Sequence, residues 1–165
     1  MGRVSSWICI AVLGCSSKED LECEVGDIDG TAEATLDGSA WMATDGGKWL
    51  ETSENFSISL ENEFRNVDLN GIAKDTNGDR VLDLIAEESF PIEVDLSGST
   101  GYGAVFDKRN GLTGYRSNLD GGSGTFVIAS VDGDTLKGCF EFVAVSDDDD
   151  QIILEVREGQ VKIDR

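Results

Sequence analysis

The feature that most constrains the fold is an alternation of apolar and polar residues with a period of two beyond about residue 30. Such alternation is typical of half-buried β-strands, because successive side chains of a strand point to opposite faces of its sheet. The alternating segments are 56–60, 67–69, 81–85, 92–96, 126–128, 140–144 and 153–156. No amphipathic helix of four turns is visible. The pattern therefore predicts a chain built from strands.

Turn signals separate these strands. They are Asp-Gly, Asn-Gly, Gly-rich and acidic runs at 37–38, 45–47, 77–79, 110–111, 120–122, 132–133 and 147–150. Short strands that alternate with such turns are joined by hairpins and form antiparallel sheets. We therefore predict an all-β fold, an antiparallel meander of about nine to ten strands that forms a sandwich or a partly open barrel. A chain of 165 residues is hardly long enough for two cores, so residues 30–165 are expected to form one domain.

The C-terminal third gives the most detailed prediction. We expect strands from Gly124, Leu136 and Ile153, and a fourth strand after a turn at 158–159. In this four-strand meander Phe140 and Phe142 point to one face, into the core. Cys139 and Glu141 point to the other face.

The first fourteen residues have the order of a signal peptide. Arg3 precedes an apolar stretch over 4–13, which is shorter than the ~20 residues needed to span a bilayer. The run Val12-Leu13-Gly14-Cys15 resembles the bacterial lipobox, in which the thiol takes a diacylglyceryl group. We predict a signal peptide over 1–14, lipidation of Cys15 and a flexible acidic tether over 15–29. The alternative is an ordinary buried strand with an incidental cysteine.

The start of the tether resembles a sorting signal of bacterial lipoproteins. Lys18-Glu19-Asp20 resembles the surface-export signal of Bacteroidota lipoproteins, and Ser16 is not the Asp of the inner-membrane retention signal. This predicts a lipid anchor in the outer membrane, with exposure at the cell surface. The alternative is a charged tether without an export function.

Two stretches of the body resemble a known family. They are D-G-S-A-W-M-A over 37–43 and a run from G-T-F-V-I at 124–128 to V-K-I at 161–163. Both resemble an uncharacterised β-rich domain family of Bacteroidota lipoproteins, over about 30–165. Cys139 stands where that family more often has a small polar residue, and Val161 where an aromatic is common. The resemblance implies a lipoprotein and a β fold, and no activity.

Charge and composition exclude several function classes. The formal charge is −20, and removal of residues 1–14 would take away Arg3 and no acid, giving −21. Such a field repels phosphates, so no nucleic acid partner is expected. Histidine is absent, which removes imidazole metal sites and Ser-His-Asp triads. We predict no enzymatic activity. A glycosidase with an acid pair is a remote alternative, because among 33 acidic residues some pair always lies close.

One loop has the spacing of a calcium site. Compared with an EF-hand calcium loop that begins at Asp75, Arg80 stands at the sixth position in place of glycine. Ala86 stands at the twelfth position in place of the bidentate glutamate. The alternative is a hairpin turn of type I′ at 77–78. The run 147–150 is a second candidate, or else a solvated, mutually repelling tip. The expected calcium ligands of the first loop are Asp75, Asn77, Asp79 and Asp83.

The remaining candidates are aromatic residues for binding a sugar and cysteines for forming a disulfide. Four aromatic residues could stack on sugars, although the two tryptophans are also expected as core anchors. Cys23 and Cys139 form either a disulfide or two separate thiols. The aromatic candidates are Trp41, Trp49, Tyr102 and Tyr115.

Together these patterns predict a cell-envelope lipoprotein with a non-catalytic β-domain in a binding or structural role. Its expected partners are the membrane, through the anchor, and a glycan or another envelope protein. The alternative is a calcium-stabilised adhesion or carbohydrate-binding module. Calcium is the one cofactor that the sequence suggests.

Overall fold

The computed structural model describes residues 22–28, 31–52, 55–71, 74–98, 101–109 and 111–164. Cys15 and the segment 18–20 lie outside these residues. In the described part of the chain, no helix has the length and apolar character needed to cross a bilayer. The elements are β1 (Ala32–Leu36), β2 (Ser39–Ala43), β3 (Asp45–Glu51), β4 (Phe56–Glu61), β5 (Arg65–Asn70), α1 (Val81–Ala86), β6 (Ile92–Asp95), β7 (Tyr102–Asp107), β8 (Thr113–Arg116), β9 (Ser123–Asp132), β10 (Thr135–Ser146) and β11 (Ile153–Asp164).

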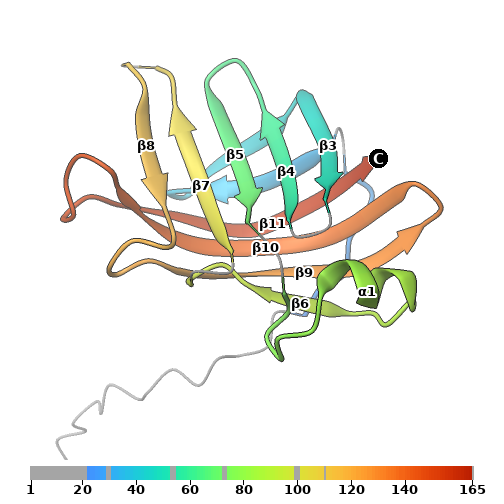
Figure 1. Ribbon diagram of the computed structural model, residues 1–165. Helices are drawn as coiled ribbons and strands as arrows, with labels where there is room; N and C mark the ends of the chain where they lie inside the picture. The colour runs from blue at the N-terminus through green and yellow to red at the C-terminus, as the bar shows by residue number, and fades with distance from the viewer. Residues whose placement is uncertain are drawn as a thin grey trace, which may run out of the picture.

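The strands form two layers (Figure 1). The first layer has the hydrogen-bonded order β2-β1-β11-β10-β9-β6, and the second has the order β3-β4-β5-β7-β8. Antiparallel pairing of Val145 with Arg116 joins β10 to β8. At the other joint β11 meets β3 at one parallel pair, Asp164 with Lys48. The result is a nearly closed barrel with one unsealed seam, which confirms the predicted all-β fold, with eleven strands.

The core fills the space between the two layers, as the alternation predicted. Phe56 of the second layer stacks on Phe126 of the first, with ring centroids 6.3 Å apart. Trp49 also packs against Phe56, with ring centroids 5.3 Å apart. Phe140 and Phe142 of β10 are buried in the same core. These contacts bury both apolar faces, and burial of apolar area is the main stabilising term.

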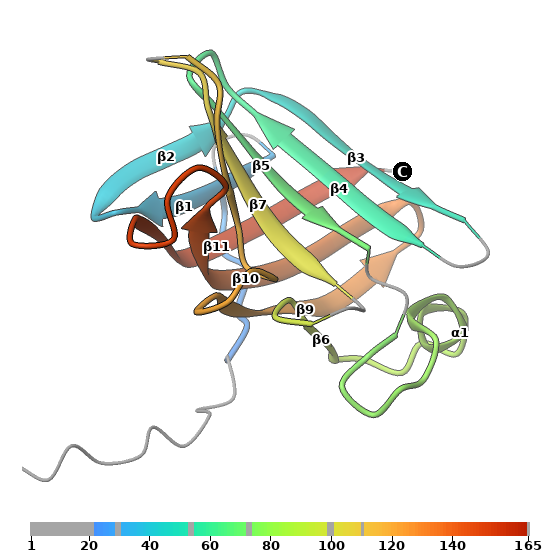
Figure 2. The same ribbon diagram turned by 60° about the vertical axis from the view of Figure 1, so that its left-hand side comes forward.

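One expected strand is wrong. Residues 81–85 form helix α1, which lies beside β6 (Figures 1 and 2). Val81 is buried, and Leu84 and Ile85 pack against the core. These positions are i, i+3 and i+4, which share one face of a helix. Five residues are too few to separate this period from an alternating one, so the sequence pattern was ambiguous.

The expected turn at 158–159 is also wrong. β11 runs without interruption through these residues, and the register with β10 shifts between Phe140 and Phe142. Glu158 has a φ of +53°. A Cβ on Gly159 would lie 2.5 Å from the ring of Phe140. Glu158 and Gly159 therefore form a β-bulge that makes room for the ring of Phe140. The predicted four-strand meander consists of three long strands.

The Gly-rich run at 45–47 is part of β3 and does not form the expected turn. Gly46 and Gly47 have φ values of +86° and +85°, and the register with β4 shifts between Gly46 and Lys48. The chain passes here from the first layer to the second. A bulge increases the local bend of a strand, which explains the two glycines at this corner.

Candidate functional site

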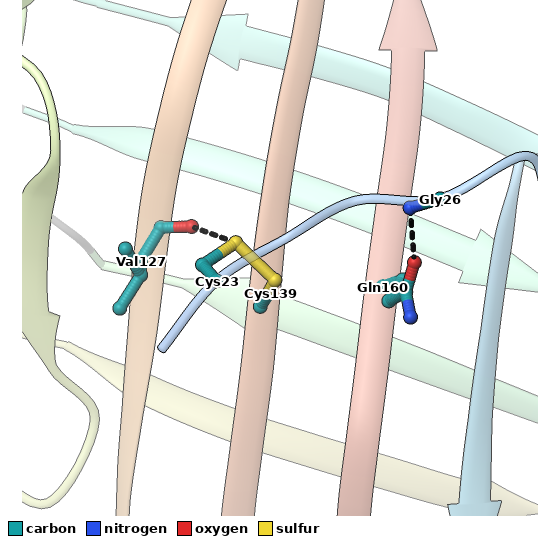
Figure 3. Close-up of a disulfide and its surroundings, with 5 residues drawn as sticks. All are labelled: Cys23, Gly26, Val127, Cys139 and Gln160. Atoms are coloured by element: carbon teal, nitrogen blue, oxygen red, sulfur yellow. Dashed lines mark hydrogen bonds between the residues drawn. A yellow bond between two sulfur atoms is a disulfide. The ribbon is translucent and has the colours of Figure 1, made fainter. Parts of the chain in front are cut away.

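The N-terminal strap, residues 22–28, begins beside β9 and crosses the outer face of β10 and β11 (Figure 3). Cys23 is bonded to Cys139 of β10, with the two Cα atoms 5.5 Å apart and a sequence separation of 116. The backbone N–H of Gly26 donates to Oε1 of Gln160 at 2.9 Å. The sulfur of Cys23 also lies 4.0 Å from the carbonyl oxygen of Val127, a contact and not a hydrogen bond, because a disulfide sulfur carries no hydrogen.

The strap is part of the folded domain. Val127 and Cys139 occupy outward-facing positions of β9 and β10, yet their exposed fractions are only 5% and 6%. The strap covers them. Residues 22–28 were expected to belong to a flexible tether, and instead they are held to the barrel at two points.

A groove of about 590 Å³ lies beside the strap, over β2, β1 and β11. Its size is that of small-ligand sites. Its lining contains two carboxylates and no basic side chain, and Gln160 belongs both to the groove and to the strap contact. The lining residues are Glu33, Ala34, Thr35, Ala40, Trp41, Met42, Glu158 and Gln160.

The four expected stacking residues are not gathered on one face. Trp41 and Trp49 are both buried in the core, although Trp41 also lines the groove. Tyr115 packs against the core from β8. Only Tyr102, half-buried at the start of β7, lies on the outer face of the second layer.

The expected calcium loop is a tight turn organised by Asp75. Its Oδ1 accepts from the N–H groups of Asn77 at 3.0 Å and Asp79 at 2.7 Å. Gly78 has a φ of +91°, and Asn77 is not among the described residues with positive φ. Type I′ needs positive φ at both central residues, so that prediction is wrong. The Gly78 N–H donates to the Asp75 carbonyl, as in a three-residue hairpin loop that ends in a glycine.

The other acids of the two calcium candidates are dispersed. Asp83 pairs with Arg80 at 3.6 Å, and Asp147 pairs with Arg116 at 3.2 Å. Among the residues that the structure describes, no three Asp, Glu or Cys side chains are gathered as a metal site requires. Calcium binding stays a prediction, and it would need these carboxylates to leave their present partners.

We expect the same melting temperature in millimolar calcium and in chelator. A ligand that binds only the native state must raise the melting temperature, and Asp75 already uses its oxygens within the turn. Scanning calorimetry in the two buffers measures this. An increase with calcium that disappears in the Asp79→Asn variant would show that the loop binds the ion.

A second outer surface was not anticipated. The polar face lies on the outside of the second layer, where Ser57 of β4 is paired with Asn70 of β5, and Ser59 with Asp68. Their side chains are joined by hydrogen bonds of 2.5 and 2.6 Å. Burial raises the pKa of Asp68 above its usual range. The polar face consists of Ser57, Ser59, Asn66, Asp68, Asn70, Tyr102 and Phe106.

The sequence contained a signal for this face. Asn66, Asp68 and Asn70 stand at alternate positions of β5, so all three project from one side of the strand. The intervening Val67 and Leu69 are buried. The pattern identifies the strand readily, and the outward positions carry short planar groups in place of the long charged side chains common on exposed strands.

Asp107 forms an ion cluster at the end of β7. Its Oδ2 lies 3.1 Å from Nε of Arg65 and 2.5 Å from Nη2 of Arg109. Hydrogen bonds from Arg109, together with those from Arg65, hold the pKa of Asp107 well below its usual range. The cluster links the beginning of β5, at Arg65, to the end of β7, at Asp107.

The Asp107→Asn variant should melt several degrees below the wild type at pH 7. A carboxylate whose folded pKa is depressed stabilises the native state above its unfolded pKa of about 4, and this stabilisation is lost as the pH falls through the folded value. The difference in melting temperature should therefore shrink between pH 5 and pH 2. Glu155→Gln, in an exposed pair with Arg157, is the control and should change the melting temperature less at pH 7. A pH-independent difference would contradict the electrostatic explanation.

No family model, no curated protein and no solved structure matches this chain. The resemblance to Bacteroidota lipoproteins therefore stays an expectation from the sequence.

Proposed function

We propose that the chain is a cell-envelope lipoprotein, acylated at Cys15, whose β-barrel is a non-catalytic binding domain outside the cytoplasm, at the outer membrane. The observation that carries the proposal is the Cys23–Cys139 disulfide. Disulfides of this kind persist in oxidising compartments and are rare in the cytosol. The predicted signal peptide over 1–14, followed by Cys15, would direct export to such a compartment.

The strap gives the proposed anchor a short reach. Cys23 follows Cys15 by eight residues, which span at most about 26 to 29 Å when extended. The strapped face of the barrel would thus stay near the membrane. Two or three acyl chains are enough for stable anchoring.

The test is acylation of the full chain in a Gram-negative host supplied with an alkyne-labelled palmitate. We expect the label on the wild type, an N-terminus at Cys15 by mass spectrometry, and recovery in the membrane fraction. Cys15→Ser should lose the label, whereas Cys9→Ser, within the signal peptide, should keep it. An intact Met1 without lipid would overturn the proposal.

Of the alternatives, carbohydrate binding is favoured by one observation, the chemistry of the polar face. No comparable observation favours the glycosidase or the calcium-stabilised module.

A further inference from the structure

We propose that the polar face binds a neutral glycan through the carboxyl and amide groups of β5 and the aromatic rings of β7. This proposal names a ligand for the binding domain proposed above. It rests on that function only for the direction in which the polar face points relative to the membrane. The strap crosses the outer side of the first layer, and the strands of the second layer lie behind that sheet (Figure 3). The polar face therefore points away from the strap and from the membrane that the strap would approach (Figures 1 and 2).

Hydrogen bonds on the face hold polar groups ready for hydroxyls. Ser59 donates to Oδ1 of Asp68, so Oδ2 of the same carboxylate can accept from a ligand. Asn70 accepts from Ser57 through Oδ1, so its Nδ2 can donate. The two groups are two residues apart on one side of β5, about 7 Å along the strand. An acceptor and a donor held at this spacing suit the hydroxyls of a sugar ring.

Aromatic rings border these groups. Tyr102 lies directly opposite Asn70, and Phe106 directly opposite Asn66. Both rings are half-buried. Directly opposite residues on neighbouring strands have Cβ atoms about 5 Å apart, so a ligand on the amides also reaches the rings. An aromatic face beside planar polar groups offers both the apolar and the polar contacts that a pyranose presents.

The charges on this side of the barrel favour an uncharged ligand. Lys108 pairs with Glu61 at 3.2 Å, and Arg116 pairs with Asp147 at 3.2 Å. Asp68 adds one carboxyl group, between Ser59 and the small side chain of Ala104. These two ion pairs and Asp68 together carry one net negative charge, in a chain with a formal charge of −20. The groove beside the strap, with Glu33 and Glu158, has a different character and would attract cations.

The experiment is titration calorimetry of the purified full chain with cello-, xylo-, manno- and maltohexaose. We expect at least one of these to bind, with a dissociation constant that rises tenfold or more in Tyr102→Ala and in Asp68→Asn. Met42→Ala, which alters the groove, should leave the constant unchanged within twofold. Melting curves of all variants establish that each is folded.

Three results would overturn the proposal. They are no heat from any hexaose at millimolar concentration, equal binding by wild type and both face variants, and loss of binding in Met42→Ala alone. A protein captured through this face with no hexaose bound would also count against it. Because the titration needs no lipid, its failure is distinct from a failure of Cys15 acylation.

Discussion

Removal of the strap disulfide is expected to lower the free energy of unfolding by about 2 to 5 kcal/mol. In the Cys23→Ser/Cys139→Ser double variant the unfolded chain regains the freedom that a closed loop of more than a hundred residues removes. Loop-closure entropy grows with loop length, so this bond lies toward the upper end of that range. For a domain of this size the melting temperature should fall by roughly 10 °C.

Chemical denaturation at pH 7 measures this loss. Wild type treated with reductant should match the double variant, and reductant should not change the variant further. A loss below about 1 kcal/mol would mean that the Gly26–Gln160 hydrogen bond and the covering of Val127 hold the strap without the covalent bond.

The second large effect is expected in the core. Phe140→Ala should cost about 3 to 5 kcal/mol, because the ring is fully buried and its removal leaves a cavity between the layers. The ring stacks on Phe142 with centroids 6.4 Å apart and fills the space left by Gly159. Urea unfolding measures the change.

Phe64→Ala is the matched control, because that side chain is 52% exposed in the turn between β4 and β5. It should change stability by less than about 0.5 kcal/mol. A similar loss in both variants would show that the ring of Phe140 contributes no more to stability than an exposed one.

Most of the fold was predictable from period-two alternation. β4, β5, β6, β9 and β10 fall on the expected segments. The predicted inward direction of Phe140 and Phe142 is confirmed, and so is the outward direction of Cys139. One face of each strand is buried, and a shift by one residue would expose the whole apolar set, so the pattern carries the orientation.

The failures have a common physical origin. Gly46, Gly47 and Gly159 looked like turn residues, but each lies within a strand. Glycine is used in turns for its positive φ and in strands where a bulge or a neighbouring ring approaches closely. Sequence alone cannot separate these uses, because the deciding contacts, with Ser59 and Phe140, come from residues distant in the chain.

The candidate sites were less predictable than the fold. The outward side chains of β5 and β7 become neighbours only because these two strands pair, although residues 71–101 lie between them in sequence. The residue type alone does not tell whether an aromatic side chain is buried or exposed, because Trp49 lies in the core and Tyr102 lies on the surface. Pairing of distant strands therefore creates the polar face.

The point at which the strap joins the barrel determines how the domain responds to mechanical load. A pull on an anchored N-terminus would pass through the Cys23–Cys139 bond into β10, a twelve-residue strand paired along most of its length with β9 and β11. Without that bond the load would fall on β1, which has five residues. The disulfide thus moves the point at which force enters the barrel from β1, with five residues, to the longer strand β10, with twelve.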